Sequence, residues 1–135
     1  MKYDEFIEQV RRRAHVSSES EAKRATQATL ETLAAYISPI ERHDAASQLP
    51  RVIKEYMQRP FLGAGKPPAP GPESSQIVED FYQRVSELEE KPLETAWEHA
   101  RAVMSVLHDA LSEGEFEDIR AELPTALYNE FFAGS

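Results

Sequence analysis

Apolar residues recur every three or four positions along most of the chain, which is the spacing of one face of an α-helix. Two such stripes open the sequence. The first is formed by Tyr3, Phe6, Ile7, Val10 and Ala14, and the second by Ala22, Ala25, Thr29, Leu33 and Ile37. No strand-length segment alternates between apolar and polar residues with period two. The pattern therefore predicts an all-α fold.

The same pattern returns in the second half of the chain. Phe6 and Val10 match Phe81 and Val85 at an offset of 75 residues, and one residue is then lost. At the new offset of 74, identical residues pair as Ala22/Ala96, Ala28/Ala102, Leu33/Leu107, Ser38/Ser112, Glu41/Glu115, Asp44/Asp118, Leu49/Leu123 and Pro50/Pro124. An internal period of this kind indicates a repeated structural unit. We predict two tandem four-helix units, residues 1–58 and 76–133. Because units this small are marginal alone, we expect about eight helices packed as one compact pseudo-two-fold domain.

Helix boundaries recur with the same period. Ser38 and Ser112 each stand three residues before a glutamate, which predicts capping boxes. In such a box the serine side-chain oxygen accepts a hydrogen bond from the amide three residues later. The glutamate side chain in turn accepts one from the serine amide. Ser18, followed by Glu21, predicts the cap of the second helix. Pro50 and Pro124 predict breaks at equivalent places, because proline disfavours helix in the residue before it.

Residues 59–75 have the composition of a linker between the two units. They are rich in proline and glycine, which favours an extended surface segment. Phe61 and Leu62 are apolar within this segment. They either pin the linker to the helices or bind a partner. Gly63 to Lys66 resembles a phosphate-binding loop only superficially, since a proline follows the lysine and no strand precedes it.

Composition and charge narrow the function classes. The chain has 135 residues, no cysteine and a net charge of −9. The absence of cysteine excludes disulfides and thiolate chemistry. Residues through Lys66 hold eleven Lys and Arg against nine Asp and Glu, whereas the rest holds four against fifteen. An acidic second half repels nucleic acid and anionic membranes. With no long apolar run and no secretory pattern at the N-terminus, we expect a cytoplasmic protein.

The residues also carry a family resemblance. The phrase Tyr3-Asp4-Glu5-Phe6, the alanine-rich stretch 22–33 and the segment Ala46-Ser47-Gln48-Leu49-Pro50 resemble the prokaryotic family known as domain of unknown function 2267. The resemblance covers nearly the whole chain and supports the helical fold. It implies no activity, cofactor or catalytic residue. The chain departs from the family's commoner pattern at residues 13–18, where a glycine is expected after the first helix and His15 is found.

No catalytic or metal-binding arrangement emerges from the sequence. None of His15, His43, His99 and His108 has an acid three residues before it, and no two lie at the four-residue spacing of zinc-protease helices. We expect all four at the surface or rim. Acid pairs such as Glu89-Glu90 and Glu117-Asp118 are typical of a solvated helix face. The sequence thus predicts no catalytic residue, no cofactor and no metal.

Three groups of residues remain as candidates for partner binding. Arg11, Arg12 and Arg13 form a basic run at the end of the first helix. They either contact phosphates or acidic partners, or complement the helix dipole. Trp97 is the single tryptophan, and it either flanks the contact between units or anchors a partner. The third group is Phe61 and Leu62 in the linker.

Our leading hypothesis is a non-catalytic helical module that binds a protein partner or self-associates. The charge polarity suggests head-to-tail contact between basic first units and acidic second units. The alternative is an enzyme or small-ligand binder that uses a cleft between the units. Nucleic-acid binding through Arg11–Arg13 is the weaker alternative, because the chain as a whole is acidic.

Overall fold

The computed structural model describes residues 1–60 and 74–132, which fold into eight α-helices with no strand among them. The N-terminal half, residues 1–60, contains α1 (Tyr3–Ala14), α2 (Glu19–Ala34), α3 (Pro39–Ala46) and α4 (Ile53–Met57). The C-terminal half, residues 74–132, contains α5 (Ser74–Glu89), α6 (Leu93–Ala110), α7 (Glu113–Glu122) and α8 (Thr125–Phe132). The all-α prediction is confirmed for this part of the chain. Within it, no helix is both long enough and apolar enough to cross a bilayer.

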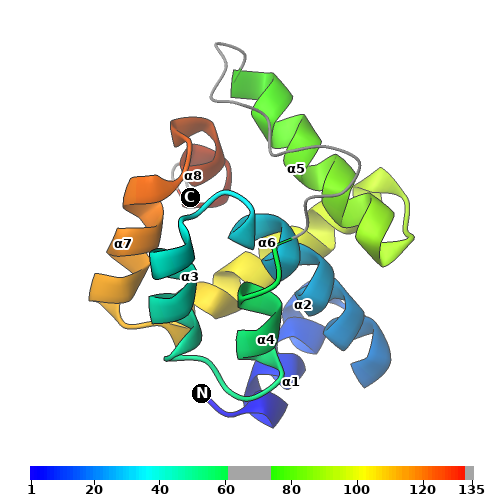
Figure 1. Ribbon diagram of the computed structural model, residues 1–135. Coiled ribbons are helices and arrows are strands. Elements are labelled where there is room, and N and C mark those ends of the chain that lie inside the picture. The colour runs from blue at the N-terminus through cyan, green and yellow to red at the C-terminus, as the bar shows by residue number, and fades with distance from the viewer. Residues whose placement is uncertain (61–73, 133–135) are drawn as a thin grey trace.

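Helices from the two halves pack against each other rather than apart (Figure 1). The helix α1 lies against α6, and α2 lies against both α5 and α6. The shorter helices form a second layer, in which α3 contacts α7, α4 covers α2, and α8 covers α5. Each half therefore buries its apolar face partly against the other half.

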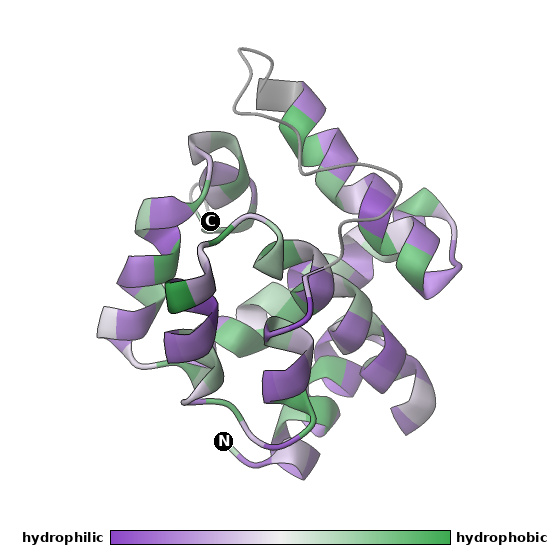
Figure 2. Cartoon of the chain, viewed as in Figure 1, coloured by the Kyte–Doolittle hydropathy of each residue, from purple (hydrophilic) through white to green (hydrophobic). Residues whose placement is uncertain are grey.

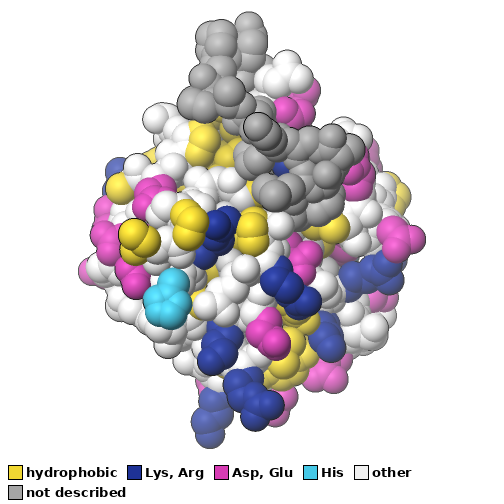
Figure 3. Space-filling view, viewed as in Figure 1, with side chains coloured by type: hydrophobic (Ala, Val, Ile, Leu, Met, Phe, Trp, Pro, Cys, Tyr) yellow, Lys and Arg dark blue, Asp and Glu magenta, His cyan; other side chains and the backbone are white. Residues whose placement is uncertain are grey.

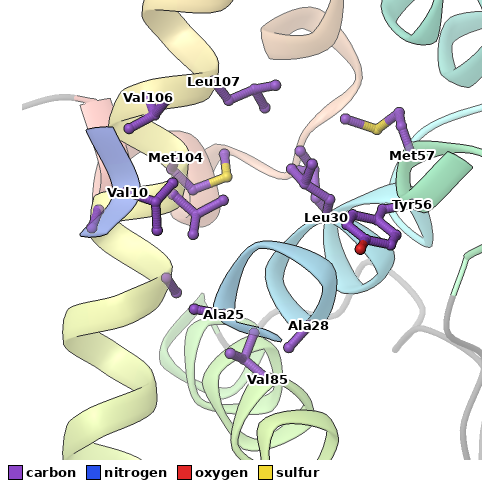
Figure 4. Close-up of a cluster of buried hydrophobic side chains, with 14 of the residues drawn as sticks. Val10, Ala25, Ala28, Leu30, Tyr56, Met57, Val85, Met104, Val106 and Leu107 are labelled. Atoms are coloured by element: carbon purple, nitrogen blue, oxygen red, sulfur yellow. The ribbon is translucent and has the colours of Figure 1, made fainter. Parts of the chain in front are cut away.

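The buried hydrophobic side chains form one cluster that draws on both halves. In Figure 2 green, hydrophobic positions and purple, hydrophilic positions follow each other at short intervals along the helices, as expected of helices with one buried face. Figure 4 shows Val10, Leu30, Val85 and Met104 converging from α1, α2, α5 and α6. The inward faces of α2 and α6 are rich in fully buried alanine, which lets helix backbones approach closely. The core positions of the first two hydrophobic stripes are confirmed as buried, except that Tyr3 is only partly buried.

The serine half of each predicted cap is confirmed. The side-chain oxygens of Ser18, Ser38 and Ser112 each accept a hydrogen bond from the amide three residues later, at 3.1 to 3.2 Å. These bonds satisfy amides that the first turn of a helix leaves without a partner. They fix where α2, α3 and α7 begin.

The prediction that Glu41 and Glu115 accept from the amides of Ser38 and Ser112 is wrong. The amide of Ser38 donates instead to Glu122 Oε1 at 2.6 Å, and the amide of Ser112 donates to Gln48 Oε1 at 2.8 Å. Both acceptors come from the opposite half of the chain. The box glutamates are released from capping because a side chain across the interface already satisfies the serine amide. They turn to the contact between α3 and α7.

The turn after α1 keeps the backbone conformation of a glycine, although His15 stands where a glycine is expected. His15 takes a left-handed backbone conformation with φ of 57°, and its amide caps the helix by donating to Arg11 and Arg12 carbonyls. This conformation favours glycine, because other residues bring Cβ close to the carbonyl oxygen. Glu90, which aligns with His15 in the second half, has the same φ. His15 and Glu90 therefore both adopt a left-handed backbone conformation that is strained for a residue with a side chain.

Replacing His15 with glycine is expected to raise the free energy of unfolding by about 0.5 to 1 kcal/mol, because relief of the left-handed strain exceeds the added chain entropy of glycine. Urea unfolding followed by circular dichroism measures the change. The matched control is His43→Gly, because His43 is an exposed histidine inside α3. Glycine at this helical position should lower the free energy of unfolding. A loss of stability in His15→Gly as large as in the control would contradict the assignment.

Candidate functional site

An apolar groove opens between α5 and α6 on the C-terminal half. It has a volume of about 440 Å³ and is lined by Glu79, Tyr82, Leu93, Glu94, Trp97 and Glu98, which we name the Trp97 groove. Leu93 and Trp97 are four residues apart on α6 and so share one face. Their exposed fractions are 49% and 44%, so two large apolar side chains are exposed next to each other. The groove therefore exposes an apolar floor to solvent.

The floor of the Trp97 groove is held in place by a polar network beneath it. Tyr82 is buried, and its hydroxyl donates to Glu130 Oε2 at 2.8 Å. Burial raises the pKa of Tyr82, so the hydroxyl stays a donor. Arg101 donates to the same carboxylate, and its guanidinium carbon lies 5.1 Å from the centre of the Trp97 ring. The tryptophan is thus supported on one side by a cation and open on the other.

The rim of the Trp97 groove is acidic. Glu79, Glu94 and Glu98 are exposed, and none forms an ion pair with any residue in the described ranges. Their negative charge is therefore available to a ligand. All residues of the groove belong to the C-terminal half. The interpretation of Trp97 as flanking the contact between units stays a prediction. A groove of this kind suits an apolar side chain flanked by positive charge.

A complementary feature stands on the N-terminal half. Ile40, the second residue of α3, has an exposed fraction of 77%. Arg42 and His43 follow it on the same short helix and, with Pro39, line a shallow hollow. Arg42 is anchored by donating to the Ala34 carbonyl at 3.1 Å. We name Ile40, Arg42 and His43 the Ile40 edge.

The face that carries the Ile40 edge is visible in the space-filling view. In Figure 3 a histidine and hydrophobic side chains lie over α3, and Lys and Arg side chains gather below them over α4 and the N-terminal end of the chain. Apolar and basic groups therefore lie side by side on this face.

Beneath the Ile40 edge, three carboxylates meet where α3 contacts α7. Oxygens of Glu41, Glu115 and Asp118 all lie within 4.8 Å of one another, and we name these residues the carboxylate cluster. Glu41 is 6% exposed and Glu115 is 8% exposed, whereas Asp118 lies at the surface. Oε2 of each buried glutamate has no hydrogen-bond partner in the structure. Buried carboxylate oxygens without a donor are rare, because removing them from water is costly.

The electrostatics of the carboxylate cluster are one-sided. Burial raises the pKa of Glu41 to about 8, helped by the contact with Glu115 and by the charges of Asp118 and Glu122. All of these neighbours are acids, and none relieves the negative charge. Such a cluster is stabilised either by a shared proton or by a bound cation.

A second buried ionisable pair joins the end of α5 to α6. His99 Nδ1 is hydrogen-bonded to Glu89 Oε2, and both side chains are almost completely buried. The expectation of a surface histidine is therefore wrong for His99, and so is that of a solvated Glu89. The cause is the crossing of the two helices, which brings together residues ten positions apart. At the aligned positions the N-terminal half has Ala14 and Ala25, both buried.

The basic run at the end of α1 is largely paired within the chain. Arg11 and Arg12 both donate to Glu8, at 2.7 to 3.0 Å. These bonds lower the pKa of Glu8 to about 2. Arg13 reaches α6, where it donates to Asp109 Oδ2 at 2.7 Å. The structure brings these arginines together with acids, not with Trp97, while Phe61 and Leu62 lie outside the described residues.

A polar hollow of about 330 Å³ lies where α2 of the N-terminal half meets α5 of the C-terminal half. It is the cleft on which a ligand-binding alternative depends. Several of its polar side chains are already hydrogen-bonded. Gln27 donates to Glu31 at 3.1 Å, and Arg24 donates to Glu90 at 2.6 Å. Ser20 and Lys23 are the other polar residues of the lining. Part of its polar lining is therefore engaged in hydrogen bonds within the chain.

Sequence reasoning missed the carboxylate cluster and the Ile40 edge. The signal for the cluster was present, because Glu41 and Glu115 align and both are glutamates. It was interpreted as helix capping. Ile40 carried no signal, because a single apolar residue beside a helix-starting proline does not by itself indicate exposure.

Comparison with known proteins places the chain in a family but gives it no activity. The model of the family described as "Uncharacterized conserved protein (DUF2267)" matches residues 3–129. No curated protein matches the chain.

Proposed function

We propose that the chain, which belongs to the DUF2267 family, is a non-catalytic protein-binding module that self-associates head to tail. In this arrangement Ile40 of one copy enters the Trp97 groove of the next. The observation that carries the proposal is that one half exposes a large apolar side chain, Ile40, while the other half carries an apolar groove with an acidic rim.

The distribution of exposed apolar residues supports this choice of partner. Among the described residues, the large hydrophobic side chains that are exposed are Met1, Ile40, Leu93 and Trp97. Apart from the first residue, they fall into one projecting side chain and one groove, on opposite halves. Large exposed apolar groups commonly mark interaction sites. A second copy of the chain supplies both surfaces at once.

Charge supports the same orientation. The first 66 residues are nearly balanced, with eleven Lys and Arg against nine Asp and Glu, while the remainder holds four against fifteen. Two identical acidic faces repel each other, whereas opposite halves attract. Because the two contacting surfaces differ, the contact is heterologous and continues into rings or open chains. Salt should weaken it.

We further infer that the two halves are related by a pseudo-two-fold axis. The contacts support this in a reciprocal way, since α1 packs on α6 while α2 packs on α5. The helix starts support it too, because Ser38 bonds to Glu122 while its aligned partner Ser112 bonds to Gln48. On this view the Ile40 edge and the Trp97 groove are departures from the symmetry, because the aligned residues are Gly114 and Lys23.

Self-association is tested with two variants that each remove one side of the contact. Ile40→Asp and Trp97→Ala are each expected to be monomers in sedimentation velocity at concentrations where the unmodified chain forms larger particles. Loss of such an anchor weakens binding by about 2 kcal/mol, roughly thirtyfold in Kd. An equimolar mixture of the two variants keeps one intact contact, so it should form a dimer and nothing larger.

The control is Lys23→Ala, which changes the exposed residue aligned with Trp97 on the other half and should associate like the unmodified chain. Circular dichroism confirms that the variants are folded. A chain that is monomeric at every concentration and salt level, or a mixture of variants that stays monomeric, overturns the proposal.

A further inference from the structure

We propose that the carboxylate cluster is a binding site for a hard divalent cation, of the Ca²⁺ or Mg²⁺ class, which joins α3 to α7. This inference does not rest on self-association. It concerns buried groups beneath the Ile40 edge rather than the edge itself. The three ligand residues are Glu41, Glu115 and Asp118.

The spacing of the three carboxylates fits a single ion. Their nearest oxygens all lie within 4.8 Å of one another. Oxygens on opposite sides of a bound Ca²⁺ are separated by at most about 5 Å, because each lies 2.3 to 2.6 Å from the ion. Glu41 comes from α3, and Glu115 and Asp118 come from α7. One ion can therefore contact both halves of the chain.

The two buried glutamates supply a second, independent observation. Each is more than nine-tenths buried, and Oε2 of each has no hydrogen-bond partner in the structure. Their usual role in a capping box is not available to explain them, because Glu122 and Gln48 already accept from the serine amides. Buried acceptors with no donor need either a proton or a cation.

The surroundings of Glu41 favour a cation. The charged groups that act on it are Glu115, Asp118 and Glu122, and all are acidic. A shared proton neutralises one charge between the two glutamates, whereas a divalent ion neutralises two and also engages Asp118. The exposed position of Asp118 leaves the ion open to solvent on one side, where water can complete its coordination.

The chemistry of the ligands selects the ion. All three are carboxylates, and no histidine or cysteine belongs to the cluster. Hard cations such as Ca²⁺, Mg²⁺ and Mn²⁺ prefer oxygen ligands, whereas Zn²⁺ and Cu²⁺ favour nitrogen and sulfur. Mn²⁺ is therefore a suitable spectroscopic probe for the site.

The test uses full-length chain stripped with EDTA in the Trp97→Ala background, so that association cannot affect the result. Titration with CaCl₂, MgCl₂ and MnCl₂ is followed by calorimetry and, for Mn²⁺, by electron paramagnetic resonance. We expect one site per chain. Glu41→Gln and Glu115→Gln should each weaken Kd roughly tenfold or more, because a ligand is lost at nearly constant shape.

Asp44→Asn is the matched control. Asp44 aligns with Asp118 but lies outside the cluster, so this variant should bind the ion as well as the parent does, while Asp118→Asn should bind it more weakly. Melting curves in EDTA establish that every variant is folded. Absence of cation binding by the parent at millimolar concentration overturns the proposal and leaves a shared proton as the explanation. Binding that Glu41→Gln and Glu115→Gln do not weaken overturns it as well.

Discussion

Replacing His99 with alanine is expected to lower the free energy of unfolding by about 3 kcal/mol, a large effect for a single substitution. The imidazole is the hydrogen-bond partner of Glu89 Oε2, and Oε1 of the same carboxylate already lacks a partner. Without the histidine, the whole carboxylate stays buried and unpaired. Urea or guanidinium unfolding measures the change.

Two further variants test whether the pairing of His99 with Glu89 causes the loss of stability. The double variant Glu89→Ala/His99→Ala reproduces the residue types that Ala14 and Ala25 provide in the N-terminal half. It should lose at least about 1 kcal/mol less than the sum of the two single variants. His43→Ala removes an exposed histidine and should change stability by less than about 0.5 kcal/mol. If the stability losses of the two single variants add up to that of the double variant, the two residues are not coupled.

In EDTA, Glu41→Gln is expected to stabilise the chain by about 2 kcal/mol at pH 9 and to have little effect at pH 4. Burial and the neighbouring acids raise the pKa of Glu41 to about 8 in the folded chain, above its ordinary value of 4.5. The protonated form is therefore favoured by folding. Its contribution is complete below pH 4.5 and is lost as the pH rises through about 8. Glutamine keeps the neutral shape at every pH.

Unfolding at a series of pH values measures this difference. The stability gap between Glu41→Gln and the unmodified chain should open between pH 4.5 and 8 and then stay constant. Asp44→Asn changes an exposed acid of the same helix and should show no such opening. A gap that is the same at pH 4 and pH 9 would contradict the raised pKa.

Most of the secondary structure could be predicted from the sequence because its causes are local. The stripe from Phe6 to Ala14 and the serines at positions 18, 38 and 112 act within one helix. Even the missing glycine followed this rule, since His15 keeps the left-handed turn that the position requires. Helical period and capping chemistry depend on neighbours three or four residues away.

The candidate sites could not be predicted in the same way because they depend on contacts between distant segments. Glu41 was interpreted as half of a capping box, a local role, but Glu122 performs that role from 84 residues away. His99 was expected at the surface because no acid lies near it in sequence, but Glu89 lies against it in the fold. Only the helix crossings reveal these partners.

The crossed helix starts also have a consequence for how disturbance spreads through the molecule. The first turn of α3 is completed by a carboxylate of α7, and the first turn of α7 is completed by an amide side chain that follows α3. Fraying of either helix withdraws an acceptor from the other, so neither end can open without loosening its counterpart. The two hydrogen bonds therefore make the starts of α3 and α7 depend on each other, although they belong to opposite halves of the chain.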